Sequence, residues 1–273
     1  MAGIESANWT IESLAALAES VRRPAALPWA ALSDPGGARR HNEDAWLTDE
    51  SSRVFALADG MGGLNAGELA SALAVRAVTE VASACLDAGL PAEKALTQAC
   101  LDAHARIKEA ALVRADCLGM GTTLVAAAID QGRLTIAHVG DSRAYLLRDG
   151  RLERLTIDHS VGQQMLEAGE LSEAQISRLP ARGILTRALG TDAIAPLPQV
   201  MTIDWQPNDL LMLCSDGLTD SLVDHALEAL LDQPQSELPS IAMMLVDAAL
   251  EAGCTDNVTV ILAGGQPRRP LNH

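Results

Sequence analysis

Residues 122 to 155 read TTLVAAAIDQGRLTIAHVGDSRAYLLRDGRLERL and contain four β-type runs separated by short turns. The runs cover 122–129, 134–139, 144–147 and 152–155, and the turn formers Asp130-Gln131-Gly132 and Asp149-Gly150 separate two of the pairs. Asp-Gly between two apolar runs is a strong signal for a tight hairpin. This stretch therefore predicts a meander of antiparallel strands.

On either side of the meander, helical and β-type segments occur in blocks and do not alternate one by one. Before it, short strands are expected at 29–33, 45–48 and 54–58, followed by helices at 66–88 and 91–115. After it, a polar, irregular region at 158–191 precedes strands at 210–214 and 258–263, with helices at 219–231 and 238–252 between them. Such blocks predict an α+β fold in which antiparallel sheets carry helices on the outside.

Length and composition are those of one large domain with an aliphatic core. The chain has 273 residues, 48% of them hydrophobic, but only one Phe and one Tyr. Residues 1–28 are expected to be an N-terminal extension, with a short helix at 11–22 and then Pro24 and Pro28, which stop helices and strands alike. The domain itself is expected at 29–265, and residues 266–273 are expected to form a tail.

The charge of the chain limits its partners. A formal net charge of −16 disfavours a nucleic-acid backbone or an anionic membrane and favours bound cations. The N-terminus lacks the apolar core of a secretory signal, and no uninterrupted apolar run reaches the roughly 20 residues of a membrane span. Five scattered cysteines without C-x-x-C spacing fit structural thiols in a reducing compartment. We therefore expect a cytoplasmic monomer without a membrane span and without a nucleic-acid partner.

An aspartate stands directly after a buried-type strand and before a glycine at two places. The run 54–58 leads into Asp59-Gly60, and the run 210–215 leads into Asp216-Gly217. Asp-Gly often marks only a turn, and that is our interpretation of Asp149-Gly150, which is flanked by two arginines. Asp59 and Asp216 instead follow almost uncharged runs, where a carboxylate is costly to bury unless a cation compensates it. The pattern indicates a metal role for both.

Other acidic residues lie in turns next to predicted strands. Asp256 precedes the strand at 258–263, and from spacing alone it is equally well explained as a capping group. Glu43, Asp44 and Asp141 also lie in short turns. Hard oxygen ligands of this kind suit Mg²⁺ or Mn²⁺ with several retained waters, and they do not suit zinc.

Taken together, these segments resemble the metal-dependent serine/threonine protein phosphatases of the PPM or type 2C family, in particular its bacterial members. The matching stretches follow the family order from residue 33 to residue 257: 33–36, 39–44, 59–63, 121–123, 140–143, 155–160, 185–190, 215–217 and 256–257. Each motif alone is weak, but a chance match of all of them in order is improbable.

The resemblance implies an αββα four-layer sandwich of two mainly antiparallel sheets flanked by helices, with two tightly bound Mn²⁺ or Mg²⁺ ions at one end. It implies that Asp59 bridges the two ions, that Asp216 and Asp256 complete the ligands of one, and that the Gly60 carbonyl binds the other. Glu43 and Asp44 are expected to act mostly through metal-bound waters. Arg39 is expected to bind the substrate phosphate, because a guanidinium fork matches phosphate geometry.

The resemblance also suggests a weaker third ion and one departure from the family pattern. Asp141 resembles a ligand of that third ion, shared with Asp216, and residues 161–182 correspond to a variable flap beside the active site. Many eukaryotic relatives have a histidine, thought to be the general acid, where this chain has Met61. His41 and His159 are alternative candidates for that role, although we favour a structural role for both.

The sequence therefore predicts hydrolysis of phosphoserine and phosphothreonine in proteins by a metal-activated water, opposing a bacterial-type Ser/Thr kinase. The phosphorylated substrates of that kinase would be the partners. Two alternatives stay open: a pseudophosphatase that binds a partner without turnover, and a phosphatase acting on small metabolites. The intact Asp59, Asp216, Asp256 and Arg39 disfavour the first.

Overall fold

The structure is a computed structural model that describes residues 27–49, 53–62, 66–176, 179–191, 197–233 and 236–265. The expected N-terminal extension, with its helix at 11–22, lies outside the described residues except for Leu27 and Pro28. The expected tail at 266–273 also lies outside them, as does Gly63 of the glycine-rich turn after Asp59.

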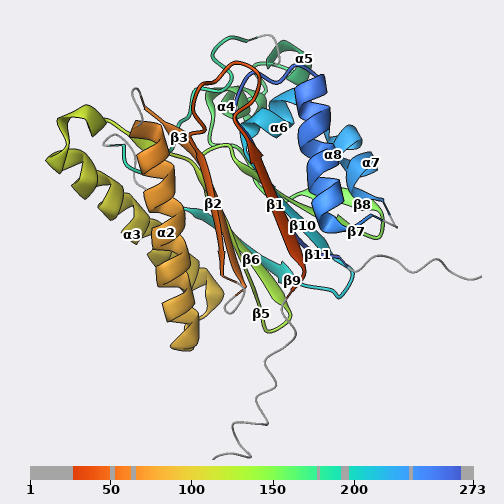
Figure 1. Ribbon diagram of the computed structural model, residues 1–273, viewed down its shortest axis with the longest axis horizontal. Coiled ribbons are helices and arrows are strands. Elements are labelled where there is room, and N and C mark those ends of the chain that lie inside the picture. The colour runs from red at the N-terminus through yellow and green to blue at the C-terminus, as the bar shows by residue number, and fades with distance from the viewer. Residues whose placement is uncertain are drawn as a thin grey trace, which may run out of the picture.

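Two antiparallel sheets form the centre of the molecule (Figure 1). The first sheet has the strand order β1 (Trp29–Asp34), β11 (Val258–Gly264), β10 (Leu210–Cys214), β7 (Arg143–Arg148) and β8 (Arg151–Arg154). The second has the order β2 (Asp44–Asp49), β3 (Val54–Met61), β5 (Leu124–Asp130), β6 (Arg133–Val139) and β9 (Gln199–Asp204), and β4 (Gly121–Thr122) pairs with β3. The predicted hairpins β5–β6 and β7–β8 are both present, although they belong to different sheets.

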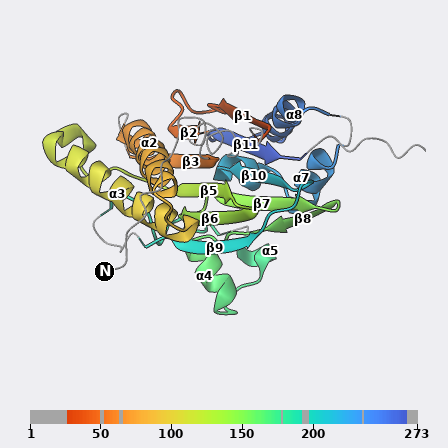
Figure 2. The same ribbon diagram turned by 90° about the horizontal axis from the view of Figure 1, so that it is seen from below.

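Helices cover the outer face of each sheet, which confirms the predicted four-layer sandwich (Figure 2). The helices α2 (Ala66–Asp87) and α3 (Ala92–Val113) lie on the second sheet. The helices α7 (Asp224–Leu231) and α8 (Leu238–Glu251) lie on the first sheet, next to the short α6 (Asp216–Ser221). The short helices α4 (Val161–Glu167) and α5 (Glu173–Ile176), and the 3-10 turn η1 (Ala115–Cys117), complete the described elements.

The apolar runs of the central strands are continuous because both faces of each strand are buried. In β3, Val54 and Ala56 pack against the helices, whereas Phe55 and Leu57 pack between the two sheets. In β10 and β11 the same alternation places one face on α7 and α8 and the other between the sheets. A strand of this kind has no polar face, so its first carboxylate marks the point where the strand leaves the core.

Among the described residues, α2 is the one helix long and apolar enough by length and composition to cross a membrane. Glu68, Arg76 and Glu80 interrupt its apolar sequence. Its small residues, such as Ala70 and Ala74, are fully buried in the cluster that joins α2, α3 and the second sheet. The apolar character of α2 is therefore that of a core helix.

The structure differs from the sequence-based expectations in three segments. The strand β9 was not predicted; it forms an edge of its sheet with half-buried residues and lacks an apolar run. The helix expected at 219–231 is divided into α6 and α7, because Leu222 and Val223 have extended backbones. The region 158–191, expected to be irregular, contains α4 and α5.

Candidate metal centre and active-site cleft

The predicted acidic residues meet at one end of the sandwich, where both sheets contribute. Asp44 begins β2 and lies opposite Asp59 of β3 in the strand register of the second sheet. Asp216 follows β10 and Asp256 precedes β11, both in the first sheet. Each carboxylate therefore sits at the rigid end of a core strand, which fixes its position.

Asp44 is buried and links the two sheets. Its Oδ2 accepts hydrogen bonds from Ser215 Oγ at 2.7 Å and Thr259 Oγ1 at 2.6 Å, both in the first sheet. Its Oδ1 is buried without a hydrogen-bond partner among the described residues. Burial raises the pKa of Asp44 to about 6, against the lowering effect of these two hydroxyls. One oxygen of Asp44 is thus fixed by the protein while the other lacks a partner.

The backbone on both sides of Asp59 is fixed by two threonines of the neighbouring strand. Its N–H donates to Thr123 Oγ1 at 2.9 Å, and its carbonyl accepts from Thr122 Oγ1 at 2.7 Å and from the Thr123 N–H at 2.9 Å. Burial, and then the charges of Asp216, Asp44 and Asp141, raise the pKa of Asp59 well above its usual value. The carboxylate lies among like charges in a place that a cation would stabilise.

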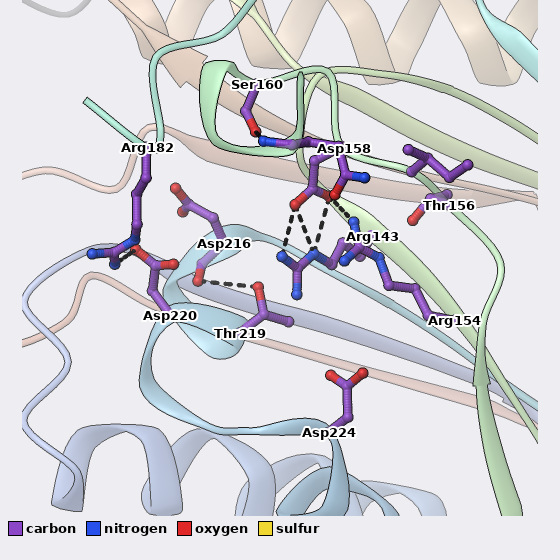
Figure 3. Close-up of polar contacts among 12 residues, drawn as sticks. Arg143, Arg154, Thr156, Asp158, Ser160, Arg182, Asp216, Thr219, Asp220 and Asp224 are labelled. Carbon is purple, nitrogen blue, oxygen red and sulfur yellow. Dashed lines mark hydrogen bonds and ion pairs between the residues drawn. The ribbon is translucent and has the colours of Figure 1, made fainter. Parts of the chain in front are cut away.

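Asp216 is in the same situation on the opposite sheet. Its Oδ1 is buried without a hydrogen-bond partner among the described residues. Burial, followed by Asp256 and Asp220, raises its pKa to about 7. Figure 3 draws Asp216 beside Thr219 and Asp220 of α6, with Arg182 reaching Asp220 from the opposite side.

Asp141 lies in the turn between β6 and β7. Burial, then Asp216 and Asp158, raise its pKa well above the usual value, whereas the lowering effect of Arg143 is smaller. Arg143 is the one positively charged residue next to Asp141 in the sequence. In the structure, however, its guanidinium pairs with Asp158, with 2.7 Å between Nη2 and Oδ2. The turn is held by Ser142, whose hydroxyl lies 2.7 Å from that of Thr123.

These residues fit divalent cations with hard oxygen ligands. Three neighbouring carboxyls, one buried and two half-buried, have raised pKa values, and two buried carboxylate oxygens have no hydrogen-bond partner among the described residues. In the described part of the chain, no group of three or more His, Cys, Asp or Glu side chains is arranged so that it could hold a metal ion by itself. Each ion would then take one or two carboxylates and complete its shell with waters or a backbone carbonyl, which is the usual pattern for Mg²⁺.

Gly60 is a position where no side chain fits. A Cβ there would lie 2.1 Å from the Gly67 carbonyl oxygen and 2.7 Å from that of Glu43. The Gly60 N–H donates to the same Glu43 carbonyl at 3.1 Å. Burial raises the pKa of the Glu43 carboxyl, which is partly exposed. The pairing of β2 with β3 therefore brings Glu43 and Gly60 together, and the start of α2 packs closely against both.

A cleft of about 490 Å³ runs over these groups. Most predicted site residues line it, together with Met61, Ile184 and Leu185; the predicted ones are Arg39, Glu43, Asp59, Gly60, Asp141, Asp216 and Asp256. Asp44 does not line the cleft and lies behind it, 9% exposed. Five carboxylates face one guanidinium there, which favours cations in the cleft.

The two histidines considered from sequence are not among the cleft residues. His41 is exposed. His159 is buried beneath the Asp141 turn: its backbone N–H donates to the Gly140 carbonyl, and its Nδ1 accepts from the Gly140 N–H at 3.1 Å. It stacks on His138, with ring centroids 4.7 Å apart. Burial lowers the pKa of His159 to about 4, so a neutral ring supports the turn.

Sequence reasoning missed the polar residues that hold the acids in place. Asn257 is the main one: its Oδ1 accepts from the Glu43 N–H at 2.8 Å, and its Nδ2 donates to the carbonyls of Pro35 and His41. The motif match included Asn257, but only as the neighbour of Asp256. In a sequence, the only signal for such a supporting residue is a hydroxyl or amide side chain next to a predicted metal ligand.

Comparison with known proteins agrees with this geometry. Residues 38–243 match a family model described as protein phosphatase 2C. A serine/threonine phosphatase stp of Listeria welshimeri is 36% identical over 235 residues, which cover 84% of this chain and 92% of that protein. The serine/threonine protein phosphatase PstP of Mycobacterium tuberculosis is 38% identical over 242 residues, 87% of this chain but 45% of PstP.

A solved structure of the catalytic domain of PstP, in complex with two manganese ions, superposes with a TM-score of 0.77. It is 34% identical in sequence, and the match covers 87% of this chain and 97% of that one. The fold is therefore that of a domain that in another protein holds two manganese ions.

Proposed function

The chain belongs to the protein phosphatase 2C family and is a serine/threonine phosphatase, and on that premise we propose that Asp59, Asp216 and Asp256 hold its Mn²⁺ or Mg²⁺ ions. The observation that carries this proposal concerns Asp44 and Asp216, on opposite sheets at one end of the sandwich: each has a buried carboxylate oxygen that no described residue hydrogen-bonds. A buried carboxylate oxygen without a hydrogen-bond donor is costly, and a cation between the sheets removes that cost.

The roles of the remaining residues follow from their positions. The charges of Asp216 at the first sheet, of Asp44 at the second and of Asp141 in the turn between β6 and β7 all raise the pKa of Asp59, and Asp59 is the proposed bridge between two ions. Glu43 and Asp44 act through the waters of those ions, and the carbonyl of Gly60 is the proposed backbone ligand. The chemistry that such ions supply is activation of a water nucleophile and neutralisation of charge on the phosphoryl oxygens.

Arg39 stands at the rim of the cleft and is the one guanidinium among its lining residues. Its planar fork can hold two phosphate oxygens. None of the five cysteines lines the cleft, so no covalent phosphocysteine step is needed.

A weaker third ion is proposed between Asp141 and Asp216, because Asp216 is the largest charge contribution to the raised pKa of Asp141. We further propose that the natural substrates are proteins phosphorylated by a bacterial Ser/Thr kinase, that the enzyme acts as a cytoplasmic monomer, and that residues 29–265 form the catalytic domain. The bacterial origin of the relatives supports the first of these proposals.

One experiment tests the proposed function directly. The purified protein is incubated with a phosphothreonine peptide with Mn²⁺, with Mg²⁺, without added metal and with excess chelator. Release of phosphate only with a divalent ion is expected, and full activity in excess chelator contradicts the metal mechanism. Absence of turnover under every condition supports a pseudophosphatase, and faster release from sugar phosphates than from phosphopeptides supports a metabolite phosphatase.

A further inference from the structure

A second cavity opens beside the catalytic cleft, between α4, α5 and α6 (Figure 3). Its volume is about 250 Å³. It shares Asp141, Gly183 and Asp216 with the cleft, so the two spaces meet. Its other walls are mixed, with the polar Ser160 and Gln163 and the apolar Leu166 and Ile176. The proposed hydrolysis uses only the edge of this space, at Asp141 and Asp216.

Two arginines and one aspartate form one wall of this second cavity. Arg143 binds Asp158 with two nitrogens, Nε at 3.0 Å from Oδ1 and Nη2 at 2.7 Å from Oδ2. Arg154 also donates to Oδ1 of Asp158. The three side chains are only 10% to 25% exposed. Two guanidiniums therefore share one carboxylate, and one positive charge is left over in a partly buried place, where it is less screened than at the surface.

The other charges around the second cavity are balanced. Arg182 pairs with Asp220, with 2.7 Å between Nη2 and Oδ2. Asp141 and Asp216 are the residues proposed to hold cations. With those cations bound, the surplus positive charge of Arg143 and Arg154 is left to attract an anionic group.

Gly183 forms the passage between the two spaces. It lines both of them, and a Cβ built on it meets no atom within 4 Å. Its φ is not in the left-handed region, so a side chain at this position introduces no backbone strain. Open space therefore lies next to Gly183 where the two cavities meet, and a bulky residue at 183 would fill it.

We propose that the second cavity is a substrate subsite for an anionic side chain, a carboxylate or a second phosphate, located near the phosphoresidue in the substrate chain. This proposal rests on the proposed function, because it assumes that the phosphoresidue lies in the cleft. The phosphoresidue lies in the cleft with its phosphate at Arg39, and the neighbouring anionic side chain passes over Gly183 toward Arg154.

The first test compares phosphothreonine peptides that differ at one flanking position, scanned on both sides of the phosphoresidue. That position carries Gln, Glu or a non-hydrolysable phosphonate analogue of phosphothreonine. At one position we expect kcat/KM for the anionic peptides to exceed that for Gln by about threefold to tenfold. A gain with both anions indicates a general anion site, and a gain with the phosphonate alone indicates a phosphate site. Equal kcat/KM for all three at every position refutes the subsite.

The second test changes the two residues that define the subsite. Arg154→Gln should remove the preference for the anionic peptide, whereas Arg154→Lys should retain part of it. Arg151→Gln, on the same strand but exposed, is the matched control and should change nothing. Gly183→Leu should abolish the preference by obstruction, and Gly183→Ala should keep it. An unchanged preference in both Arg154→Gln and Gly183→Leu overturns the proposal, provided that circular dichroism shows a folded protein.

An aryl phosphate, which has no flanking side chain, separates this proposal from the proposed function. Both Arg154 variants should hydrolyse it at the rate of the unmodified protein, whereas the Gly183 variants are judged by their peptide preference alone, because Gly183 also lines the catalytic cleft. If the unmodified protein hydrolyses neither the aryl phosphate nor the Gln peptide with Mn²⁺, the proposed function itself fails. If it hydrolyses both and shows no preference for an anionic neighbour, only the subsite fails.

Discussion

Arg39 donates to Asp256 across the catalytic cleft, with 2.9 Å between Nη2 and Oδ2. The two residues come from the loop after β1 and the loop before β11. Their side chains are 52% and 41% exposed, so the pair contributes little to stability in water. Arg39 is thus held next to a proposed metal ligand by a weak interaction, and it can exchange that partner for a substrate phosphate.

Arg39→Ala should raise KM for a phosphothreonine peptide by about tenfold and lower kcat less, because the guanidinium contacts the transferred group and not the nucleophile. Steady-state kinetics on one peptide at saturating Mn²⁺ measures both constants. Arg40→Ala is the matched control, since Arg40 is exposed and does not line the cleft. An unchanged KM in Arg39→Ala would rule out the phosphate-binding role.

Asp59→Asn, Asp216→Asn and Asp256→Asn should each weaken Mn²⁺ binding in calorimetry and lower kcat by roughly two orders of magnitude or more. The fold should persist, because these side chains lie at strand ends and not in the apolar clusters. Asp149→Asn, at the tip of the β7–β8 hairpin, should bind Mn²⁺ as the unmodified protein does. Normal Mn²⁺ affinity in two of the three ligand variants would show that the site is assigned incorrectly.

In the absence of metal, Asp216→Asn should stabilise the protein. Burial and neighbouring acids raise the pKa of Asp216 in the folded state to about 7, above the unfolded value near 3.8. The charged form is therefore unfavourable in the folded state above pH 7, and this destabilisation disappears as the pH falls from 7 toward 4. In excess chelator, Asp216→Asn should melt at least about 2 °C higher than the unmodified protein at pH 8.

The same comparison at pH 5 provides the control, because the unmodified Asp216 is then largely protonated and the difference in melting temperature should shrink. With saturating Mn²⁺ the order should reverse, since ions that bind only the folded state stabilise the unmodified protein. A melting temperature that is lower for Asp216→Asn at pH 8 in chelator would show that Asp216 is not strained by neighbouring negative charge.

The fold and the acidic residues could be predicted because each depends on a local pattern. The β5–β6 and β7–β8 hairpins follow from their turns, and Asp59 and Asp216 follow from the point where an apolar strand ends. The strand β9 could not be predicted, because an edge strand with half-buried residues has no such pattern. The role of Asn257 could not be predicted either, since its partners Glu43 and Pro35 are more than 200 residues away in sequence.

The thiols should be dispensable for catalysis. Burial raises the pKa of both Cys100 and Cys214 to about 12, which leaves almost no thiolate near neutral pH. Cys85 is the only partly exposed cysteine of the five. A maleimide reagent should therefore modify Cys85 first, as measured by intact-protein mass spectrometry, while phosphatase activity persists. Cys85→Ser should remove that modification, and loss of activity in step with modification of another thiol, without unfolding, would argue for a cysteine mechanism.

Asn257→Asp changes only one amide group to a carboxyl, but it should both destabilise the protein and weaken substrate binding. The Nδ2 group of Asn257 donates to the carbonyl oxygens of Pro35 and His41, at 2.9 and 3.1 Å. A carboxylate would place an oxygen there, so two carbonyls would lose their donor and face a negative charge instead. The loop from Pro35 to Glu43, which carries Arg39, would then lose two of its hydrogen bonds to the start of β11.

The expected loss of stability for Asn257→Asp is about 1–3 kcal/mol, the usual range for leaving a buried polar group unsatisfied. KM for the phosphopeptide should rise as well, because Arg39 would no longer be held at the rim of the cleft. Urea denaturation and steady-state kinetics measure the two effects. Asn208→Asp, at an exposed position remote from the cleft, is the matched control and should change neither. If Asn257→Asp unfolds at the same urea concentration as the unmodified protein and keeps its KM, then Asn257 does not hold the loop. Arg39 would in that case owe its position to other contacts, such as its own bond to Asp256 and that of the Gly37 N–H to the Cys254 carbonyl.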